Sequence, residues 1–244
     1  MNIIEFTENK RRQIEIMCAR FFLFSPDEEI MKLFQMVRFP RISPRFNIAP
    51  SQPVLAITNS RNGFQVNHFQ WGLIPGWSKD PASGQAMINA RSETAATKPS
   101  FKGAFRYRRC LIPANGFYEW KSAGNRSKQA MCVRLKESPL FAMAGLWEQW
   151  QGPDGTELGT CSVLTTAANT LLESIHPRMP VILEPNQFNR WLGSERTPIP
   201  QLESLLQTFP AEEMEAFPVS SYVNKVAHDS PECIAPIQEQ KTLF

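Results

Sequence analysis

The sequence predicts a single compact α+β domain built on an antiparallel, barrel-like β-sheet with peripheral helices. Short strand-like runs outnumber helical patterns, and the two kinds follow one another without the regular βαβ order of a parallel sheet. No repeat, low-complexity tract or clear linker divides the 244 residues. A chain of this length buries enough apolar surface to fold without disulfides or structural metals.

We expect the domain to span residues 17–237, with an extension at 1–16 and a tail at 238–244. The extension is rich in charged residues and lacks the apolar core of a signal peptide. We interpret it as a removed leader or as the product of a start codon upstream of Met17.

The first element expected is a helix. Ser25-Pro26-Asp27-Glu28 reads as a capping box with proline at the first helical position. Apolar residues at helical spacing continue to Val37, which predicts a helix of about three turns. The prolines between residues 40 and 53 then predict an extended loop.

A hairpin is expected next, because Asn62-Gly63 is a strong turn signal between two strand-like runs, residues 54–58 and 64–71. Further runs of strand character occupy residues 110–113, 117–121, 130–135, 140–146 and 161–165. Helical patterns occupy residues 166–174, 185–192 and 200–206.

Composition excludes several classes of protein. The net charge of +3 is too small to indicate nucleic-acid binding by itself. The five cysteines form no CxxC pair, which argues against a disulfide scaffold or zinc site, and Cys110, Cys132 and Cys161 are expected in the core. We expect a reducing cytoplasm, no metal or cofactor, and no membrane partner, since no run of about 18 apolar residues exists.

Cys18 directly follows Met17. If Met17 were the start and were removed, Cys18 would carry an α-amine and a thiol on neighbouring carbons. An amine attacks an aldehyde to give a Schiff base, and the thiol then closes a five-membered thiazolidine. As an internal residue, Cys18 would instead be an inert or core cysteine.

Two motifs in the sequence contain polar residues that suit a reactive site. Asn89 and Arg91 lie two apart, so an extended segment points both to one face, where amide and guanidinium suit a sugar hydroxyl and a phosphate. Glu119 shares a strand with aromatic residues, which would desolvate it for acid–base work. The alternatives are a loop asparagine, a surface arginine and a surface glutamate.

Two loops add further candidates. His176 lies in a proline-flanked loop, where it suits proton transfer or a purely structural role. Trp71 and Trp77 flank a Gly/Pro loop; Trp71 is expected in the core, and Trp77 is the better candidate for stacking on a base.

Taken together, seven runs resemble the SRAP family, whose members crosslink to abasic sites in single-stranded DNA. They occur in the family's order, and the resemblance covers about Met17 to Ile237. The runs are Met-Cys-Ala-Arg-Phe, Phe-Asn-Ile-Ala-Pro, Trp-Gly-Leu-Ile-Pro-Gly-Trp, Ile-Asn-Ala-Arg-Ser-Glu-Thr, Gly-Phe-Tyr-Glu-Trp, Leu-Thr-Thr-Ala-Ala-Asn and Ile-His-Pro-Arg-Met-Pro.

The resemblance implies that Cys18 is the N-terminal crosslinking residue and that three polar residues surround it: Asn89, Glu119 and His176. It also implies a set of DNA-contacting residues, in which the arginines hold phosphates and the others grip or splay the strand: Arg20, Arg91, Arg178, Asn47, Pro50 and Trp77. The family fold it implies is a compact α+β domain with a positively charged groove.

Three departures from the family pattern stand out. Ala19 replaces a usual glycine, and Pro177 replaces a frequent aspartate that would be a charge partner for His176 or Arg178. Residues 1–16 are the third, because an amide nitrogen cannot form a Schiff base.

The function expected is therefore a thiazolidine crosslink between Cys18 and an abasic site, which shields the lesion during the DNA damage response. Weak lyase activity is compatible with the imine stage, and we expect a monomer. One alternative is an autoproteolytic cysteine-type peptidase that cleaves before Cys18. Another is a non-covalent single-stranded DNA-binding module.

Overall fold

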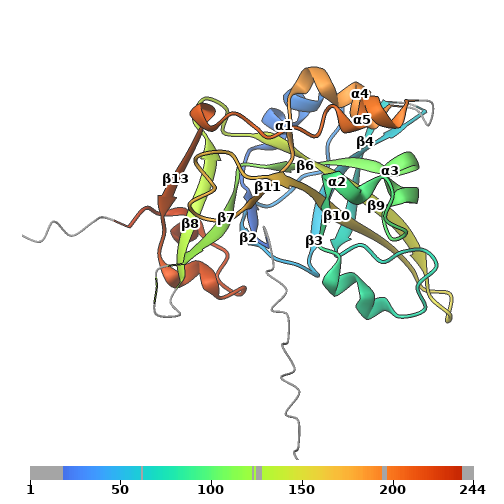
Figure 1. The fold of residues 1–244 in the computed structure, drawn as a ribbon, viewed down its shortest axis with the longest axis horizontal. Helices are drawn as coiled ribbons and strands as arrows, with labels where there is room; N and C mark the ends of the chain where they lie inside the picture. The colour runs from blue at the N-terminus through green and yellow to red at the C-terminus, as the bar shows by residue number, and fades with distance from the viewer. Residues whose placement is uncertain (1–18, 62, 123, 125–127, 194–196, 238–244) are drawn as a thin grey trace, which may run out of the picture.

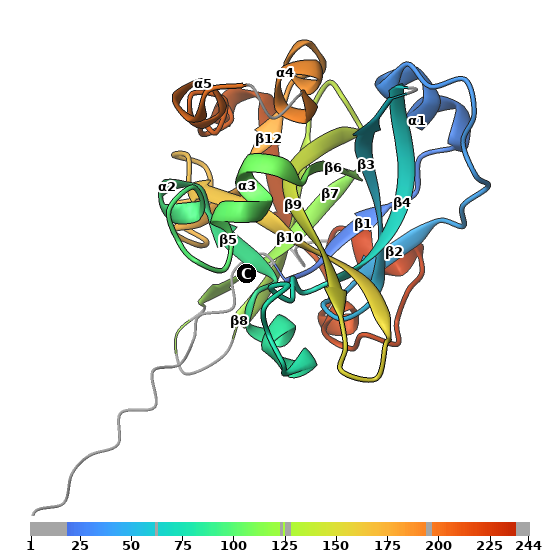
Figure 2. The same cartoon turned by 90° about the vertical axis from the view of Figure 1, so that its right-hand side faces the viewer.

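Two β-sheets pack against each other around one apolar core (Figures 1 and 2). The computed structural model describes residues 19–61, 63–122, 124, 128–193 and 197–237. Phe21 of the smaller sheet meets Trp71 of the larger one edge-on, with ring centroids 5.2 Å apart. The two sheets therefore form one domain.

The smaller sheet is antiparallel throughout. Its five strands run in the order β13 (Met214–Pro218), β8 (Lys128–Leu135), β7 (Gly116–Ser122), β1 (Phe21–Leu23) and β2 (Arg45–Ile48).

The larger sheet closes into a barrel. Its ring consists of β10 (Glu157–Ala167), β4 (Gly63–Trp71), β3 (Pro53–Ser60), β6 (Arg109–Ala114) and β9 (Phe141–Gln151), and β9 pairs back with β10. Three short strands extend it: β5 (Asn89–Arg91), β11 (Arg178–Pro180) and β12 (Ile182–Leu183). The predicted fold class is confirmed, although β10 pairs in parallel with β4 and β5.

The helices are short and lie around the outside of the sheets (Figure 2). The α-helices are α1 (Asp27–Phe34), α2 (Ser92–Ala95), α3 (Lys102–Tyr107), α4 (Phe188–Leu192) and α5 (Ile199–Glu203). The short 3₁₀ helices are η1 (Pro81–Ala86), η2 (Pro185–Gln187), η3 (Ala211–Glu213), η4 (Ser221–Asn224) and η5 (Pro231–Ile234). The predicted hairpin and the two later helices are confirmed by β3–β4, by η2–α4 and by α5.

The first helix is shorter than predicted. Its predicted capping box does not form, because the Ser25 hydroxyl donates to Glu29 Oε2 at 2.7 Å. Gln35 takes a left-handed conformation with φ of 51° and ends the helix. Val37 therefore lies beyond it and is 93% exposed.

The helix predicted at residues 166–174 is wrong. β10 continues to Ala167 and pairs with β11, so tertiary strand pairing outweighs the local helical pattern. The Asn169 side chain then accepts from Leu172 N at 3.0 Å and holds a series of turns. This difference matters for the site, because it determines where residues 176–178 emerge.

Residues 219–237, called here the C-terminal strap, cover the outer face of the smaller sheet (red in Figure 1). They enclose a second apolar cluster whose buried members are Phe22, Tyr118, Ala130, Cys132, Val219, Val223 and Cys233.

Cys110, Cys132 and Cys161 are buried, as predicted, and their thiols are free. Burial raises the pKa of Cys132 to about 12, so this thiol stays protonated and inert at neutral pH. Among the described residues, no helix has the length and apolar character needed to cross a membrane.

Gly116→Ala is predicted to destabilise the fold, since a Cβ there would lie 2.3 Å from Phe22 Cζ and 2.5 Å from the Val133 carbonyl oxygen. We expect a loss of about 2–3 kcal/mol in the free energy of urea unfolding. Gly103→Ala in α3 is the control: its nearest neighbour would lie at 3.5 Å, so stability should hold or rise slightly. Equal stability of Gly116→Ala and the parent would contradict this packing.

Candidate functional site

The start of β1 is fixed to β7 by main-chain bonds. Tyr118 N donates to the Arg20 carbonyl at 2.9 Å, and Phe21 pairs with Phe117. Continuing this antiparallel register places Ala19 opposite Glu119 on β7. Cys18 itself lies outside the described residues. Ala19, which is covalently joined to Cys18, is thus aligned with Glu119, one of the predicted catalytic residues.

Glu119 is buried, with only 2% of its surface exposed. It lies in β7 between fully buried Tyr118 and half-buried Trp120, and the same strand becomes exposed at Lys121. This placement matches the desolvated position that the sequence predicted.

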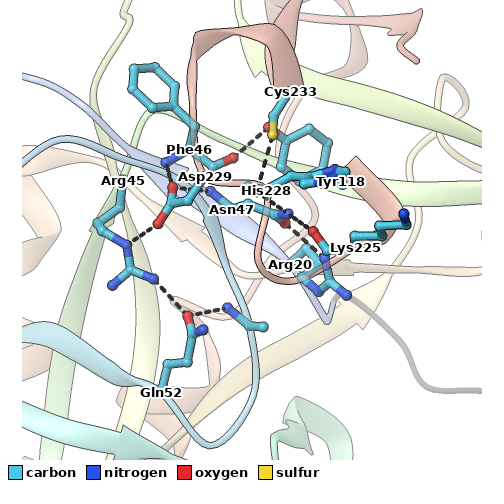
Figure 3. Close-up of polar contacts among 11 residues, drawn as sticks. Arg20, Arg45, Phe46, Asn47, Gln52, Tyr118, Lys225, His228, Asp229 and Cys233 are labelled. Carbon is cyan, nitrogen blue, oxygen red and sulfur yellow. Dashed lines mark hydrogen bonds and ion pairs between the residues drawn. The ribbon is translucent and has the colours of Figure 1, made fainter. Parts of the chain in front are cut away.

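Arg20 is held by neutral acceptors (Figure 3). Its Nη1 donates to Asn47 Oδ1 at 2.8 Å and to the Val223 carbonyl at 2.9 Å, while Nη2 reaches the Asn224 carbonyl at 3.4 Å. The guanidinium also lies 5.9 Å from the ring centroid of Trp120, a cation–π distance. Burial lowers the pKa of Arg20, yet the group remains charged.

Asn47 is completely buried, with 0% exposure. Its Nδ2 lies within hydrogen-bond distance of three carbonyl oxygens of the C-terminal strap, which share its two hydrogens: Val223 at 3.0 Å, Lys225 at 3.0 Å and His228 at 2.7 Å. In the structure this amide lies inside the protein, where it touches Arg20. The role in gripping DNA that the family resemblance implies for Asn47 stays a prediction.

Four other arginines of the described chain are paired with carboxylates, whereas the acceptors of Arg20 among the described residues are neutral. These ion pairs are Arg45–Asp229, Arg108–Glu148, Arg134–Glu215 and Arg178–Glu93. A half-buried cation with only neutral partners keeps its full positive charge, and an anionic ligand can neutralise it.

A second group of predicted residues gathers along the last part of β10. Thr165 pairs with Arg91 of β5 on one side and with Pro180 of β11 on the other. Within β5, Asn89 is half-buried and Arg91 exposed, while Ala90 between them is buried. The predicted alternation, with amide and guanidinium on one face, is confirmed.

Arg178 reaches across β10 and forms a two-pronged ion pair with Glu93, at 2.5 and 2.8 Å. It also donates to the Thr165 carbonyl at 2.5 Å. Sequence reasoning missed Glu93, which supplies the carboxylate partner that Pro177 cannot.

The hydrogen bond from Arg178 lowers the pKa of Glu93. A carboxyl with a lowered folded-state pKa stabilises the folded chain above its unfolded-state pKa. This contribution is lost as the pH falls through the folded-state value. The ion pair is therefore intact at neutral pH.

His176 is oriented by the main chain of the same loop. The Arg178 N–H donates to its Nδ1 at 3.1 Å, which assigns the proton of the neutral ring to Nε2. Nε2 is buried and has no hydrogen-bond partner among the described residues. A buried donor without a partner costs free energy, so a bound hydroxyl or phosphate oxygen would satisfy it.

Pro50 lies in the loop between β2 and β3, and Trp77 lies in the loop that follows β4. Ser51, which follows Pro50, has φ of 67° and donates to the Trp71 carbonyl at 2.8 Å. Trp71 is buried and donates from Nε1 to the Ile88 carbonyl, whereas Trp77 is 68% exposed. The predicted division between a core tryptophan and an exposed one is confirmed.

The chain is similar to proteins of one family along most of its length. Residues 17–226 match the model of the SOS response associated peptidase (SRAP) family. The abasic site processing protein YoqW of Bacillus subtilis is 46% identical over 221 residues, which covers 89% of this chain and 99% of that protein. The abasic site processing protein HMCES of Gallus gallus is 34% identical over 239 residues, which covers 84% of this chain and 69% of that protein.

Solved structures agree with this similarity. A crystal structure of a protein from Bacteroides thetaiotaomicron superposes with a TM-score of 0.81 at 25% identity, covering 91% of this chain and 100% of the other. The family match, the identities and the shared fold all concern the same residues, and on these grounds the chain belongs to the SRAP family.

Proposed function

We propose that this chain processes abasic sites: it binds single-stranded DNA and forms a covalent thiazolidine with the lesion through Cys18, in the response to DNA damage. The observation that carries the proposal is the alignment of the segment joined to Cys18 with buried Glu119 on β7. The family match from Met17 and the relatives named abasic site processing proteins support it.

The chemistry requires a free α-amine, so residues 1–16 and Met17 must be absent from the active form. The amine of Cys18 attacks C1′ of the open-chain sugar, and loss of one water gives an imine. The thiol then adds across the C=N bond, its proton passing to nitrogen. The net change is one molecule of water released, and no oxidant or reductant is consumed.

Three residues would assist these steps. Glu119, buried beside the start of β1, exchanges a proton with the sugar ring oxygen and favours ring opening. Asn89 holds the amine or the sugar, and His176 offers Nε2–H to the sugar or the backbone. Because amine and thiol belong to one residue, ring closure is intramolecular, which lowers the entropic cost of the second step.

The DNA backbone would be held from two sides. Arg20 comes from the smaller sheet with its positive charge unneutralised, and Asn47 acts on DNA through Arg20. Arg91 and Arg178 come from strands on either side of β10. Pro50 and Trp77 act beside the lesion, where the exposed indole stacks on a base.

Two further activities follow from the same groups. The imine makes the neighbouring C–H acidic, so weak β-elimination of the strand, a lyase reaction, accompanies crosslinking. Self-cleavage of the Met17–Cys18 bond, with one water consumed, is a second candidate, because it would generate the terminus that crosslinking needs.

A protein that begins at Cys18 is predicted to form a band with abasic single-stranded DNA that survives a denaturing gel. Cys18→Ala should abolish the band, since without the thiol the reaction stops at the imine, which hydrolyses. Cys18→Ser should also give no stable band, since an imine or an oxazolidine formed with the hydroxyl hydrolyses. The control strands carry either no lesion or an abasic site whose aldehyde has been reduced with borohydride.

Several results would contradict the proposal. A band that persists in Cys18→Ala, or that forms equally with the reduced site, rules out this chemistry. Binding without any covalent band would favour a non-covalent module. Intact mass during storage tests self-cleavage: only loss of residues 1–17 that Cys18→Ala prevents would favour the peptidase.

Trp77→Ala is predicted to weaken binding of undamaged single-stranded DNA, because loss of one stacked base costs about 1–3 kcal/mol. Trp77→Phe keeps a stacking ring and should recover most of the affinity. Since Trp77 is largely exposed, both variants should unfold at the same temperature as the parent. Fluorescence anisotropy measures the affinity. If the alanine variant binds as tightly as the parent, Trp77 does not stack on a base.

Glu93→Gln is predicted to tighten DNA binding, because it frees the charge of Arg178 for a phosphate. The slope of log affinity against log salt should steepen by about one unit. Glu215→Gln is the matched control: it breaks the ion pair between edge strand β13 and Arg134 of β8 and should change neither value. An unchanged slope in Glu93→Gln would argue against a phosphate at Arg178.

A further inference from the structure

A carboxylate on the C-terminal strap lies directly behind the residue that holds Arg20. Asp229 accepts from Arg45 Nε and from the main-chain N–H groups of Phe46 and Asn47, the last at 3.0 Å (Figure 3). It therefore ties the start of β2 to the strap and sets the position of Asn47.

The amide of Asn47 can face only one way. Its Nδ2 faces three carbonyl oxygens of the strap, which share its two hydrogens, so Oδ1 must point to the guanidinium of Arg20. A flipped amide would set N–H groups against Arg20 and oxygen against three carbonyls. The position of Asn47 thus fixes the direction of Arg20.

The part of the strap that supplies these acceptors, residues 222–228, is held in one conformation by its own side-chain contacts. The ring of His228 stacks on Tyr222 with centroids 3.8 Å apart, and its Nδ1 lies 2.7 Å from the Tyr222 carbonyl. Asn224 Oδ1 accepts from Trp120 Nε1 at 2.9 Å. The carbonyls that receive Arg20 are therefore held in place by contacts of their own.

We infer that Asp229 is a positioning residue for DNA binding, acting through Asn47 on Arg20, and that the strap forms the rear wall of the phosphate site beside the lesion. The inference rests on the proposed function, in which Arg20 contacts a phosphodiester. A carboxylate placed directly against Arg20 would neutralise it. Asp229 acts one residue away and orders the site without cancelling its charge.

The position of Arg20 in the chain places this arrangement close to the reacting residue. Arg20 is two residues from Cys18, so under the proposed function the phosphate that it binds lies next to the reacting sugar.

The test is a double-mutant cycle on the binding of an undamaged single strand, with the parent, Asp229→Asn, Arg20→Gln and the double variant. Each protein begins at Cys18, and affinity is measured between about 50 and 200 mM salt. Asp229→Asn keeps the shape of the side chain and removes only its charge. Glu215→Gln again serves as the control for loss of a surface carboxylate.

We expect Asp229→Asn to weaken binding about five-fold and to flatten the salt slope by up to about one unit. In the Arg20→Gln background the same change should have no further effect. If Asp229→Asn weakens binding equally in both backgrounds, or leaves the affinity and slope of the parent, the inference is overturned.

Thermal unfolding shows whether Asp229→Asn is folded at the assay temperature. If it is not, Asp229→Glu, which keeps the charge and displaces it by one methylene, takes its place in the cycle under the same criteria. A purely structural Asp229 would lower the unfolding temperature without the dependence on Arg20.

This result is separable from the proposed chemistry. A parent that binds and crosslinks while the cycle is additive overturns only the role of Asp229. A parent that binds DNA with the expected coupling yet forms no covalent band overturns only the crosslink. A parent that binds no single-stranded DNA overturns both.

Discussion

The site depends on how the first described residues of the chain are held from two directions. The main chain of Arg20 bonds to Tyr118 of β7, and its guanidinium is fixed by Asn47 and the C-terminal strap. If the main-chain bond or the guanidinium contacts were lost, the segment that follows Cys18 would not be fixed beside Glu119. A reaction that needs both the amine and the thiol of one terminal residue requires this kind of anchoring.

The distribution of charge follows the same logic. Arg178 is paired with Glu93, whereas the acceptors that Arg20 meets among the described residues are all neutral. In the proposed function the two cations differ before DNA binds, because Arg20 is available at once, whereas Arg178 must exchange its carboxylate for a phosphate. The buried Nε2 of His176, without a partner among the described residues, adds a donor to the side on which Arg178 lies.

Local patterns predicted much of this arrangement. The turn signal at residues 62–63, the alternation of Asn89 and Arg91, and the burial of Glu119 among aromatics each depend on neighbours in sequence. Contacts between distant segments could not be read in this way. Glu93 and Arg178 are 85 positions apart, and no spacing rule links them. The strap is further still from β2 in the sequence, so the contacts of Asn47 with residues 223–228 could not be predicted. Strand pairing with β11 likewise replaced the helix that residues 166–174 predict locally.

The central claim is that the terminal residue of the active chain carries the lesion on both nitrogen and sulfur. Nuclease digestion of the crosslinked product, followed by tandem mass spectrometry, tests it directly. The account predicts one adduct, on Cys18 at the chain terminus, with a mass equal to peptide plus sugar fragment minus one water and with no free thiol at that residue. An adduct on a lysine, or on a chain that still carries residues 1–16, would contradict it.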